Sequence, residues 1–224
     1  DSISIGTLNL LDTMRFLQRP IRLYNAASGE CFGETSEQGA DEETAFKPRS
    51  PYAVAKATAH WLVMNYRESY GLHACSGILF NHESPLRPER FVTQKIVATA
   101  CRISQGSKEK LQLGRVDIFR DWGWAPEYVE AMWAILQQGD ADDYVIATGQ
   151  SNSLRTFAEA VFETLDLDID AHLTQTASLH RPADIVHGKG NASKATSVLG
   201  WTAHNKMADV ARLMVEARLH QRSP

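Results

Sequence analysis

The early part of the chain places a long helical segment between two short apolar ones, and this order restricts the fold more than any other feature. Residues 21–27 are predicted to form a strand, and residues 73–80 are mostly apolar and short, as expected of a buried strand. Between them, Ser50 and Pro51 are typical of a helix start, and Gly71 is typical of a helix end. A strand, a helix and a second strand in this order are typical of parallel strands joined by a helical crossover. We therefore predict an α/β fold with a mainly parallel sheet.

The rest of the 224-residue chain continues this alternation. The spacing of apolar residues predicts helices at 3–17, 51–70, 91–105, 126–137, 154–165, 191–199 and 204–219, and strands at 21–27, 73–80, 111–113 and 143–147. Irregular stretches follow Asn81, and residues 166–190 are polar without a clear period. These stretches indicate a smaller lobe packed beside the sheet.

Charge, cysteine content and hydropathy exclude several classes of partner. The formal net charge of −4 gives no general attraction to nucleic acid or an anionic membrane, so an anionic ligand needs a local group of Arg and Lys. The 3 cysteines are widely spaced and odd in number, which is typical of buried thiols in a reducing compartment. The printed sequence has no apolar run that could cross a bilayer, and His172, His180 and His187 are too scattered to indicate a metal site. We expect a cytoplasmic protein that binds no nucleic acid, membrane or metal.

Tyr52 and Lys56 lie four positions apart on the predicted helix, so their side chains share one face. An ammonium group near a phenol favours the phenolate and lowers the pKa of the phenol, which would make Tyr52 a general acid or base near neutral pH. The small residues 53–55 between them would allow a ligand to approach closely. The alternative is an ordinary surface pair, because many helices carry Tyr and Lys at this spacing.

Ser28 and Glu30 directly follow the first predicted strand. If extended backbone continues to Glu30, the two side chains point the same way. Ligands of parallel α/β sheets bind beyond the carboxyl ends of the strands, and Tyr52 begins the next helix at that end. A hydroxyl, a carboxylate and a phenol would then meet in one crevice. The alternatives are a serine that caps a turn and a solvated loop acid.

Two arginines stand in loops beside stiff or small residues: Arg120 precedes Asp121, and Arg181 precedes a proline, with Asp184 close by. Two fixed guanidinium groups can bind a pyrophosphate through paired hydrogen bonds. The alternative is a pair of structural salt bridges to the neighbouring aspartates.

Several motifs together resemble a known family. They are residues 24–33 (YNAASGECFG), 48–56 (PRSPYAVAK), 77–85 (GILFNHESP), 91–95 (FVTQK), 120–123 (RDWG) and 143–149 (DYVIATG). The first two resemble the catalytic strand and helix of extended short-chain dehydrogenases/reductases. The whole set resembles the GDP-mannose 4,6-dehydratase family within that group, over nearly the whole chain and least between residues 167 and 179.

This resemblance implies a Rossmann-type fold with a small C-terminal substrate-binding lobe. Residues 1–90 would be the C-terminal part of an NADP-binding domain that carries the catalytic residues. Residues 91–224 would mainly form the lobe, with segments returning to the sheet. The reaction implied is the conversion of GDP-mannose to GDP-4-keto-6-deoxymannose with transient hydride transfer to NADP.

The resemblance also implies a role for each matching residue. Tyr52 would take the proton of the sugar C4 hydroxyl, Ser28 would hydrogen-bond the C4 oxygen, and Lys56 would hold the nicotinamide ribose. Once C4 is a ketone and the C5 hydrogen is acidic, Glu30 would remove it and help to expel the C6 hydroxyl as water.

Further positions are carried over as binding residues. His82 and Arg87 would contact NADP, although a packed structural histidine is the alternative for His82. The positions carried over as GDP-mannose contacts are Asn81, Val92, Lys95, Arg120, Arg181 and Asp184. Family members also pair the helices at 3–17 and 51–69 between subunits, so we expect at least a homodimer, with a homotetramer left open.

The chain departs from the family pattern in four ways. Ser28 stands where the family usually has Thr, Gly29 where it has Ser, and Asp184 where it has Glu. No glycine-rich turn for a dinucleotide, such as G-x-G-x-x-G, stands between a strand and a helix in this sequence. We therefore expect a fragment of a longer product or a sequence without its start. The alternatives are a truncated, non-catalytic nucleotide-sugar-binding remnant and another NDP-sugar dehydratase or epimerase.

Overall fold

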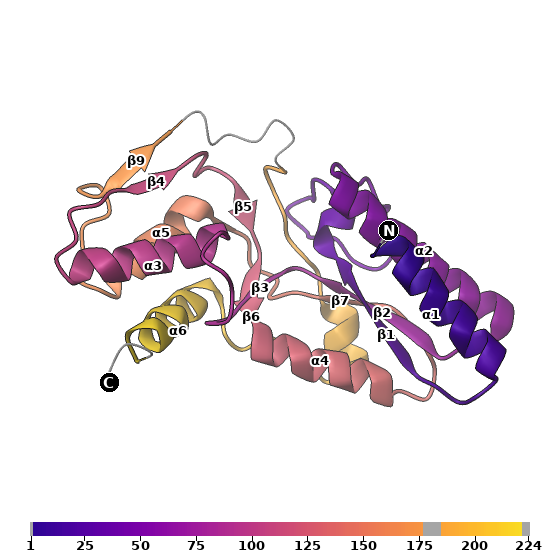
Figure 1. Ribbon diagram of the computed structural model, residues 1–224. Helices are drawn as coiled ribbons and strands as arrows, with labels where there is room; N and C mark the ends of the chain where they lie inside the picture. Colours follow the sequence, from indigo (N-terminus) through magenta and orange to yellow (C-terminus); the bar gives the residue numbers. More distant parts are fainter. Residues whose placement is uncertain (1, 177–184, 221–224) are drawn as a thin grey trace.

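The computed structural model describes residues 2–176 and 185–220, which form two parts side by side (Figure 1). The first part is built on a sheet and contains α1 (Ser4–Leu17), β1 (Leu23–Ser28), the 3-10 turn η1 (Gly29–Phe32), α2 (Pro51–Tyr70), β2 (Ala74–Leu79), α4 (Ala125–Gln137), β7 (Tyr144–Ile146) and the π-helical turn η3 (Ala195–Leu199). The second part, the lobe, contains β3 (Asn81–Glu83), α3 (Val92–Ser104), β4 (Leu111–Leu113), β5 (Phe119–Arg120), β6 (Trp122–Trp124), β8 (Asn152–Ser153), α5 (Leu154–Glu163), β9 (Leu173–Gln175) and α6 (Met207–His220).

The main sheet is parallel, as the sequence predicts, with strand order β1-β2-β7. Successive residues of β2 face opposite sides because side chains alternate along a strand. Ala74 packs with Leu11 of α1 and Val63 of α2, whereas Cys75 packs with Ile135 of α4. The sheet is therefore a layer between α1 and α2 on one face and α4 on the other (Figure 1).

The predicted signals at the ends of α2 are confirmed. The Ser50 hydroxyl accepts a hydrogen bond from the Ala53 amide at 3.0 Å, which satisfies one of the free N–H groups of the first turn. Gly71 ends the helix in the left-handed region at φ 65°, where glycine has no steric penalty. Together they place Tyr52 in the first turn of α2, beside the end of β1.

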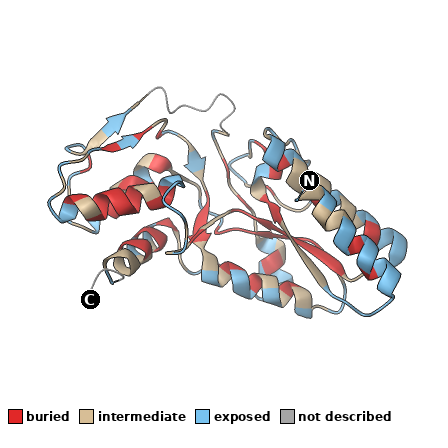
Figure 2. Cartoon of the chain, in the orientation of Figure 1, coloured by how far each residue is buried: buried red, intermediate tan, exposed pale blue. Residues whose placement is uncertain are grey.

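The lobe packs its helices against one another. Its core contains Ile96 and Cys101 of α3, Phe157 and Phe162 of α5, and Met214 of α6, all with at most 1% of their surface exposed. Figure 2 shows the same pattern, with most of α3 in the buried colour. The apolar faces of these three helices are thus covered by one another and by the short strands around them.

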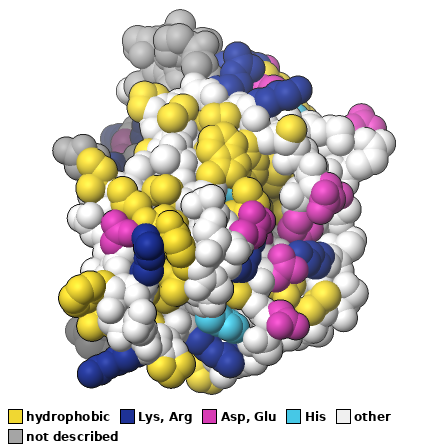
Figure 3. All heavy atoms as spheres, turned by 90° about the vertical axis from the view of Figure 1, so that its right-hand side faces the viewer, with side chains coloured by type: hydrophobic (Ala, Val, Ile, Leu, Met, Phe, Trp, Pro, Cys, Tyr) yellow, Lys and Arg dark blue, Asp and Glu magenta, His cyan; other side chains and the backbone are white. Residues whose placement is uncertain are grey.

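The outer faces of α1 and α2 carry apolar side chains that the described chain leaves exposed. Phe16 is 85% exposed, Leu10 57%, Val54 51% and Trp61 49%. The space-filling view of this side shows groups of apolar side chains, with Lys, Arg, Asp and Glu side chains between and beside them (Figure 3). Single exposed apolar residues are common, but a group on two neighbouring helices is typical of a surface that binds a partner.

The local structure differs from the sequence analysis at two places: the condition set for Ser28 and Glu30 is not met, and the prediction for 166–190 is wrong. Extended backbone ends at Ser28 instead of continuing to Glu30, because Ser28 caps the 3-10 turn that follows and accepts a hydrogen bond from the Glu30 amide at 3.2 Å. The predicted irregular segment 166–190 contains β9, which pairs with β4. The strands that the sequence did not predict are β3, β5, β6, β8 and β9, each of two or three residues, too short to show a period of two.

Within the two described ranges, no helix is both long and apolar enough to span a bilayer. The same ranges contain no group of three or more His, Cys, Asp or Glu side chains arranged as metal ligands.

Candidate active site

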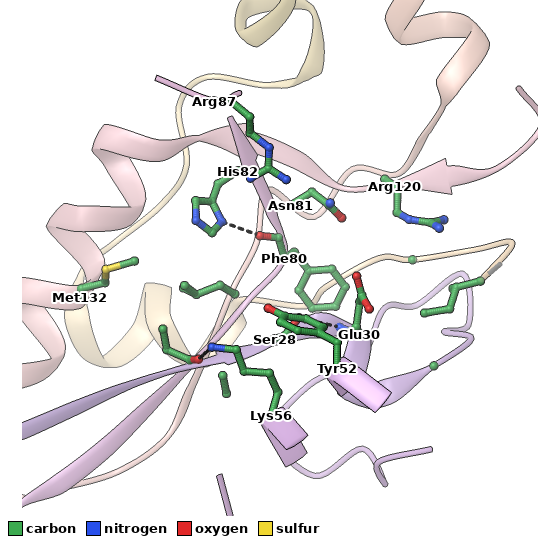
Figure 4. A pocket seen from close by; sticks show the side chains of 17 residues that line it. Ser28, Glu30, Tyr52, Lys56, Phe80, Asn81, His82, Arg87, Arg120 and Met132 are labelled. Atoms are coloured by element: carbon green, nitrogen blue, oxygen red, sulfur yellow. Dashed lines mark hydrogen bonds between the residues drawn. The ribbon is translucent and has the colours of Figure 1, made fainter. Parts of the chain in front are cut away.

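A cavity of about 370 Å³ opens at the carboxyl ends of β1 and β2, where the sheet meets the lobe. Its walls are formed by Ala26, Ala27, Ser28, Gly29, Glu30, Gly33, Tyr52, Lys56, Leu79, Phe80, Asn81, His82, Arg87, Arg120, Met132, Ile185 and Gly188. Figure 4 shows two groups of polar residues that face each other across the cavity. One side carries Ser28, Glu30, Tyr52 and Lys56, and the lobe side carries Asn81, His82, Arg87 and Arg120. This is the position at which parallel α/β sheets bind ligands.

Tyr52 and Lys56 come from the first two turns of α2 and line the same wall. The Lys56 Nζ atom lies 5.8 Å from the centroid of the Tyr52 ring and donates a hydrogen bond to the Ala26 carbonyl at 2.7 Å. This bond holds the ammonium group at the end of β1. Burial lowers the pKa of Lys56, because a cation is less stable away from water.

The prediction that Lys56 lowers the pKa of Tyr52 is wrong for this state of the protein. Burial raises the pKa of Tyr52, with Glu30 adding to the shift and Ser28 and Arg87 opposing it. Ser28, Glu30, Cys31 and Arg87 are the groups that shift the pKa of Tyr52 besides burial, whereas the Lys56 ammonium group donates its hydrogen bond to the Ala26 carbonyl. Tyr52 is therefore a protonated phenol near neutral pH.

Ser28 and Glu30 reach the cavity through the 3-10 turn at the end of β1. Ser28 is 9% exposed, and its hydroxyl lies close to Tyr52 in Figure 4. The Glu30 carboxylate projects into the cavity beside them. A Cβ atom on Gly29 would lie 3.1 Å from the Phe80 ring, so the glycine allows the turn and this ring to pack closely.

The opposite wall is basic and carries a neutral histidine. His82 Nδ1 lies 2.9 Å from the Phe80 carbonyl oxygen, and burial is the main cause of the lowered pKa of His82. A carbonyl can only accept, so Nδ1 carries the proton and Nε2 is left as an acceptor. The ring stacks on Tyr128 at 4.9 Å, which fixes its plane. Arg87 and Arg120 add two guanidinium groups to this wall.

Two of the predicted site residues that the structure describes, Val92 and Lys95, do not line the cavity. Val92 and Lys95 lie on the first turn of α3, and the Lys95 ammonium donates to the Gln112 carbonyl at 2.6 Å. Arg181 and Asp184 fall outside the described residues. The predicted residues that meet in the cavity are Ser28, Glu30, Tyr52, Lys56, Asn81, His82, Arg87 and Arg120.

The sequence did not point to several residues of the wall. Met132 enters from α4, and Ile185 and Gly188 enter from the segment before η3. Asp121, next to Arg120, is fully buried behind this wall and does not line the cavity. Its carboxylate accepts hydrogen bonds from the Thr148 amide at 2.9 Å and from the Thr148 hydroxyl at 2.7 Å. No local pattern marks Met132 or Ile185, because both act through contacts between distant segments.

The arrangement combines a phenol, a carboxylate and an ammonium group with a cationic wall. The phenol, the carboxylate and the ammonium group can add protons to the carbon or oxygen atoms of a ligand or remove them. The cationic wall can bind an anionic ligand such as a phosphate. A cavity with both is suited to proton transfer on a phosphorylated or nucleotide-linked substrate.

The sequence profile of a family described as GDP-mannose 4,6 dehydratase matches residues 1–214. GDP-mannose 4,6 dehydratase 1 of Arabidopsis thaliana is 44% identical over 223 residues, which cover 98% of this chain and 62% of that protein. GDP-mannose 4,6-dehydratase of Sinorhizobium fredii is 43% identical over 235 residues, with 96% and 67% coverage. The chain thus spans about 60–67% of the length of the first curated relatives that it matches.

Two solved structures show the same fold at low sequence identity. The dTDP-glucose 4,6-dehydratase of Bacillus anthracis in complex with NAD has a TM-score of 0.89 and 21% identity, and the match covers 98% of this chain and 68% of that one. RMD of Pseudomonas aeruginosa, complexed with NADPH, has a TM-score of 0.87 and 24% identity, with 97% and 73% coverage. Both support the α/β architecture of the described residues.

Proposed function

This chain belongs to the GDP-mannose 4,6-dehydratase family, and we propose that it carries the catalytic and nucleotide-sugar-binding residues of an enzyme that converts GDP-mannose to GDP-4-keto-6-deoxymannose. One observation carries the proposal. Glu30 lies in the same cavity as Tyr52 and Lys56, opposite two arginines. The reaction needs a base for the C5 hydrogen as well as an acid/base for the C4 hydroxyl, and the cavity holds a candidate for each.

The cavity fits a nicotinamide nucleotide, and we propose NADP. His82 presents an acceptor nitrogen to the cavity, and Arg87 a cation, which suit the hydroxyl and amide groups and the phosphates of such a cofactor. Lys56 would hold the nicotinamide ribose. Such a cofactor, when bound, would supply a hydride acceptor for C4 and a hydride donor for C6.

Tyr52 would remove the proton from the C4 hydroxyl. Its pKa is raised in the described state, so it must fall before the phenol can act as a base. The Lys56 ammonium, 5.8 Å from the ring centroid, can lower it after exchanging its hydrogen bond to Ala26. The Ser28 hydroxyl, in the same wall, would bind the C4 oxygen.

Glu30 would take the proton from C5 after C4 has become a ketone. The ketone stabilises the negative charge that forms at C5, and the C5–C6 double bond forms as the C6 hydroxyl departs with a proton as water. Glu30 is exposed to the cavity and not tied to a cation in the described structure, so it is available for this step. A simple epimerase or reductase needs no carboxylate at this position to take the C5 proton.

The nucleotide-sugar substrate would lie toward the lobe. Asn81 and Arg120 line that side of the cavity, and Val92 and Lys95 stand on the first turn of α3 beyond it. The remaining predicted contacts, Arg181 and Asp184, would complete the site. On this proposal residues 1–90 serve mainly the cofactor and catalysis and residues 91–224 mainly the substrate, with β7 returning to the sheet.

We further propose a homodimer formed through α1 and α2. Phe16, Val54 and Trp61 are large apolar side chains that stay about half exposed or more on these helices, and pairing with a second copy would bury them (Figure 3). The buried free thiols Cys31, Cys75 and Cys101 support a reducing, cytoplasmic location.

The proposal is tested by incubating the purified chain with GDP-mannose and NADP and following the sugar nucleotide by mass spectrometry. We expect a product lighter by one water, which Tyr52→Phe abolishes. Tyr70→Phe, at the far end of α2, is the matched control and should leave the product unchanged. A product of unchanged mass but new retention would replace the dehydratase with an epimerase. Bound GDP-mannose without any product would indicate a binding protein.

A further inference from the structure

Glu83 is a buried carboxylate that the proposed reaction does not use. It ends β3, one residue after His82, and 1% of its surface is exposed. It does not line the cavity, so it cannot touch a ligand there. A buried charge is costly unless other groups compensate it, so its partners show what it holds in place.

Two groups that follow Glu83 in the chain meet the same oxygen of its carboxylate. The Thr93 hydroxyl, in the first turn of α3, donates to Oε2 at 2.8 Å. The Arg87 Nε atom lies 3.0 Å from Oε2, four residues after Glu83. The Nε–H of Arg87 does not point along that line and makes no hydrogen bond, so the contact is an ion pair.

The Arg87 side chain is held from a second side as well. Its Cζ atom lies 4.2 Å from the centroid of the Phe91 ring, within cation–π range. A free arginine samples many rotamers, and ordering it costs free energy when a ligand binds. Glu83 and Phe91 remove most of this freedom in advance, and the guanidinium group that results lines the cavity.

We propose that Glu83 is a positioning residue, which fixes the Arg87 guanidinium in the cavity for an anionic group of the nicotinamide nucleotide and anchors the first turn of α3 through Thr93. The assignment of Arg87 to the nicotinamide nucleotide rests on the proposed function. The same carboxylate thereby joins the cofactor side of the cavity to the helix that carries the proposed substrate contacts Val92 and Lys95. Burial raises the pKa of Glu83 to about 7, while the nearby Arg87 cation and the hydrogen bond from Thr93 oppose the shift and favour the ionised form.

The first test uses the protein without ligand. Phenylglyoxal modifies arginine side chains, and peptide mass spectrometry follows Arg87 and Arg90 separately. We expect Glu83→Gln, which keeps the shape and an acceptor for Thr93, to speed modification of Arg87 about threefold or more. Arg90 is the internal control, because it is exposed and lies outside this ion pair. An unchanged rate at Arg87 would overturn the proposal.

The second test is a double-mutant cycle on NADP affinity, with kcat and KM measured wherever turnover is found. We expect Glu83→Gln to weaken NADP binding about tenfold and to raise KM for NADP with little change in kcat. In the Arg87→Gln background the same change should have no further effect, because Glu83 acts through Arg87. The positioning role would be overturned if the losses in NADP affinity from Glu83→Gln and Arg87→Gln added fully in the double mutant while all variants unfolded at the same midpoint. Glu83 would then support the fold only.

Failure of the proposed function gives a different result. If the unmodified chain does not bind NADP, or if Arg87→Gln binds it normally, the assignment of Arg87 to the cofactor is wrong. Faster modification of Arg87 in Glu83→Gln would still support the conclusion that the ion pair with Glu83 orders the Arg87 side chain.

Discussion

The sheet part and the lobe bury their apolar residues in different ways. Among the described residues, the lobe gathers 20 buried hydrophobic residues in one core between α3, α5 and α6. In the sheet part, the buried hydrophobic residues form three separate groups of 10, 7 and 4 residues, on the two faces and at the end of the sheet. A sheet separates what packs on its two faces, whereas three helices can share one interior.

This difference shows where each part has surface available for binding. The lobe helix α3 buries nine of its 13 residues. In the sheet part, Phe16 and Trp61 remain exposed on the outer helices. The cavity lies between the two parts, and its polar groups come from strand ends, loops and the first two turns of α2 instead of from either core. Changes in the cavity should therefore affect activity, and changes in the lobe core should affect stability.

The largest effect is expected from Glu30→Gln. Removing a general base lowers turnover about 10²–10⁴-fold, and the free energy of unfolding should hardly change because Glu30 is exposed. Rates of water loss from GDP-mannose and thermal unfolding curves check this result. Glu37→Gln, in the exposed loop just beyond, is the matched control. A loss of stability equal to the loss of activity would break the separation between site and core.

Phe157→Ala should destabilise the protein by about 3–5 kcal/mol, because it empties part of the lobe core at a fully buried position. Urea unfolding followed by circular dichroism measures the change. Trp133→Ala removes a larger ring that is 67% exposed on α4, and it should change stability by about 0.5 kcal/mol or less. Equal effects of the two changes would contradict a single closed core in the lobe.

A smaller effect concerns Glu83, at the junction of the two parts. Its pKa is about 7 in the folded protein against an ordinary value of 4.5, so between these values the folded state binds more protons than the unfolded state. Stability therefore falls as pH rises. From pH 5 to 8 the protein should lose about 2–3 kcal/mol through this group. Glu83→Gln should lack this part of the pH dependence, and parallel curves for the two proteins would contradict the assignment.

The smallest effect is expected at Glu34, which ties the loop after the 3-10 turn η1 to the segment that enters the cavity wall. Its carboxylate accepts hydrogen bonds from the Val186 amide at 2.7 Å and the His187 amide at 2.9 Å. Glu34→Gln should weaken these bonds by about 1 kcal/mol, because the group is partly exposed and one charge is lost. Hydrogen exchange at the two amides should then be about fivefold faster, with exchange in α5 unchanged. Equal protection in both proteins would show that Glu34 does not hold this wall.

Much of the fold and part of the site could be predicted from the sequence. Ser50, Pro51 and Gly71 mark the ends of α2 through interactions within one helical turn, and apolar periodicity marks most other helices. The order of strand, helix and strand then requires Ser28 and Tyr52 to lie at one end of a parallel sheet. These features are local, or follow from connections that leave few alternatives.

Other properties were decided only by the tertiary structure. Met132 and Gly188 reach the cavity from elements far from Tyr52 in the chain, and no pattern within either segment records that contact. The pKa of Tyr52 rises instead of falling because the surrounding protein removes water, while Lys56 bonds to the backbone. Helix signals depend on neighbours a few residues away. Proton affinity and the shape of a cavity depend on which distant groups exclude water, and that is known only when the chain is folded.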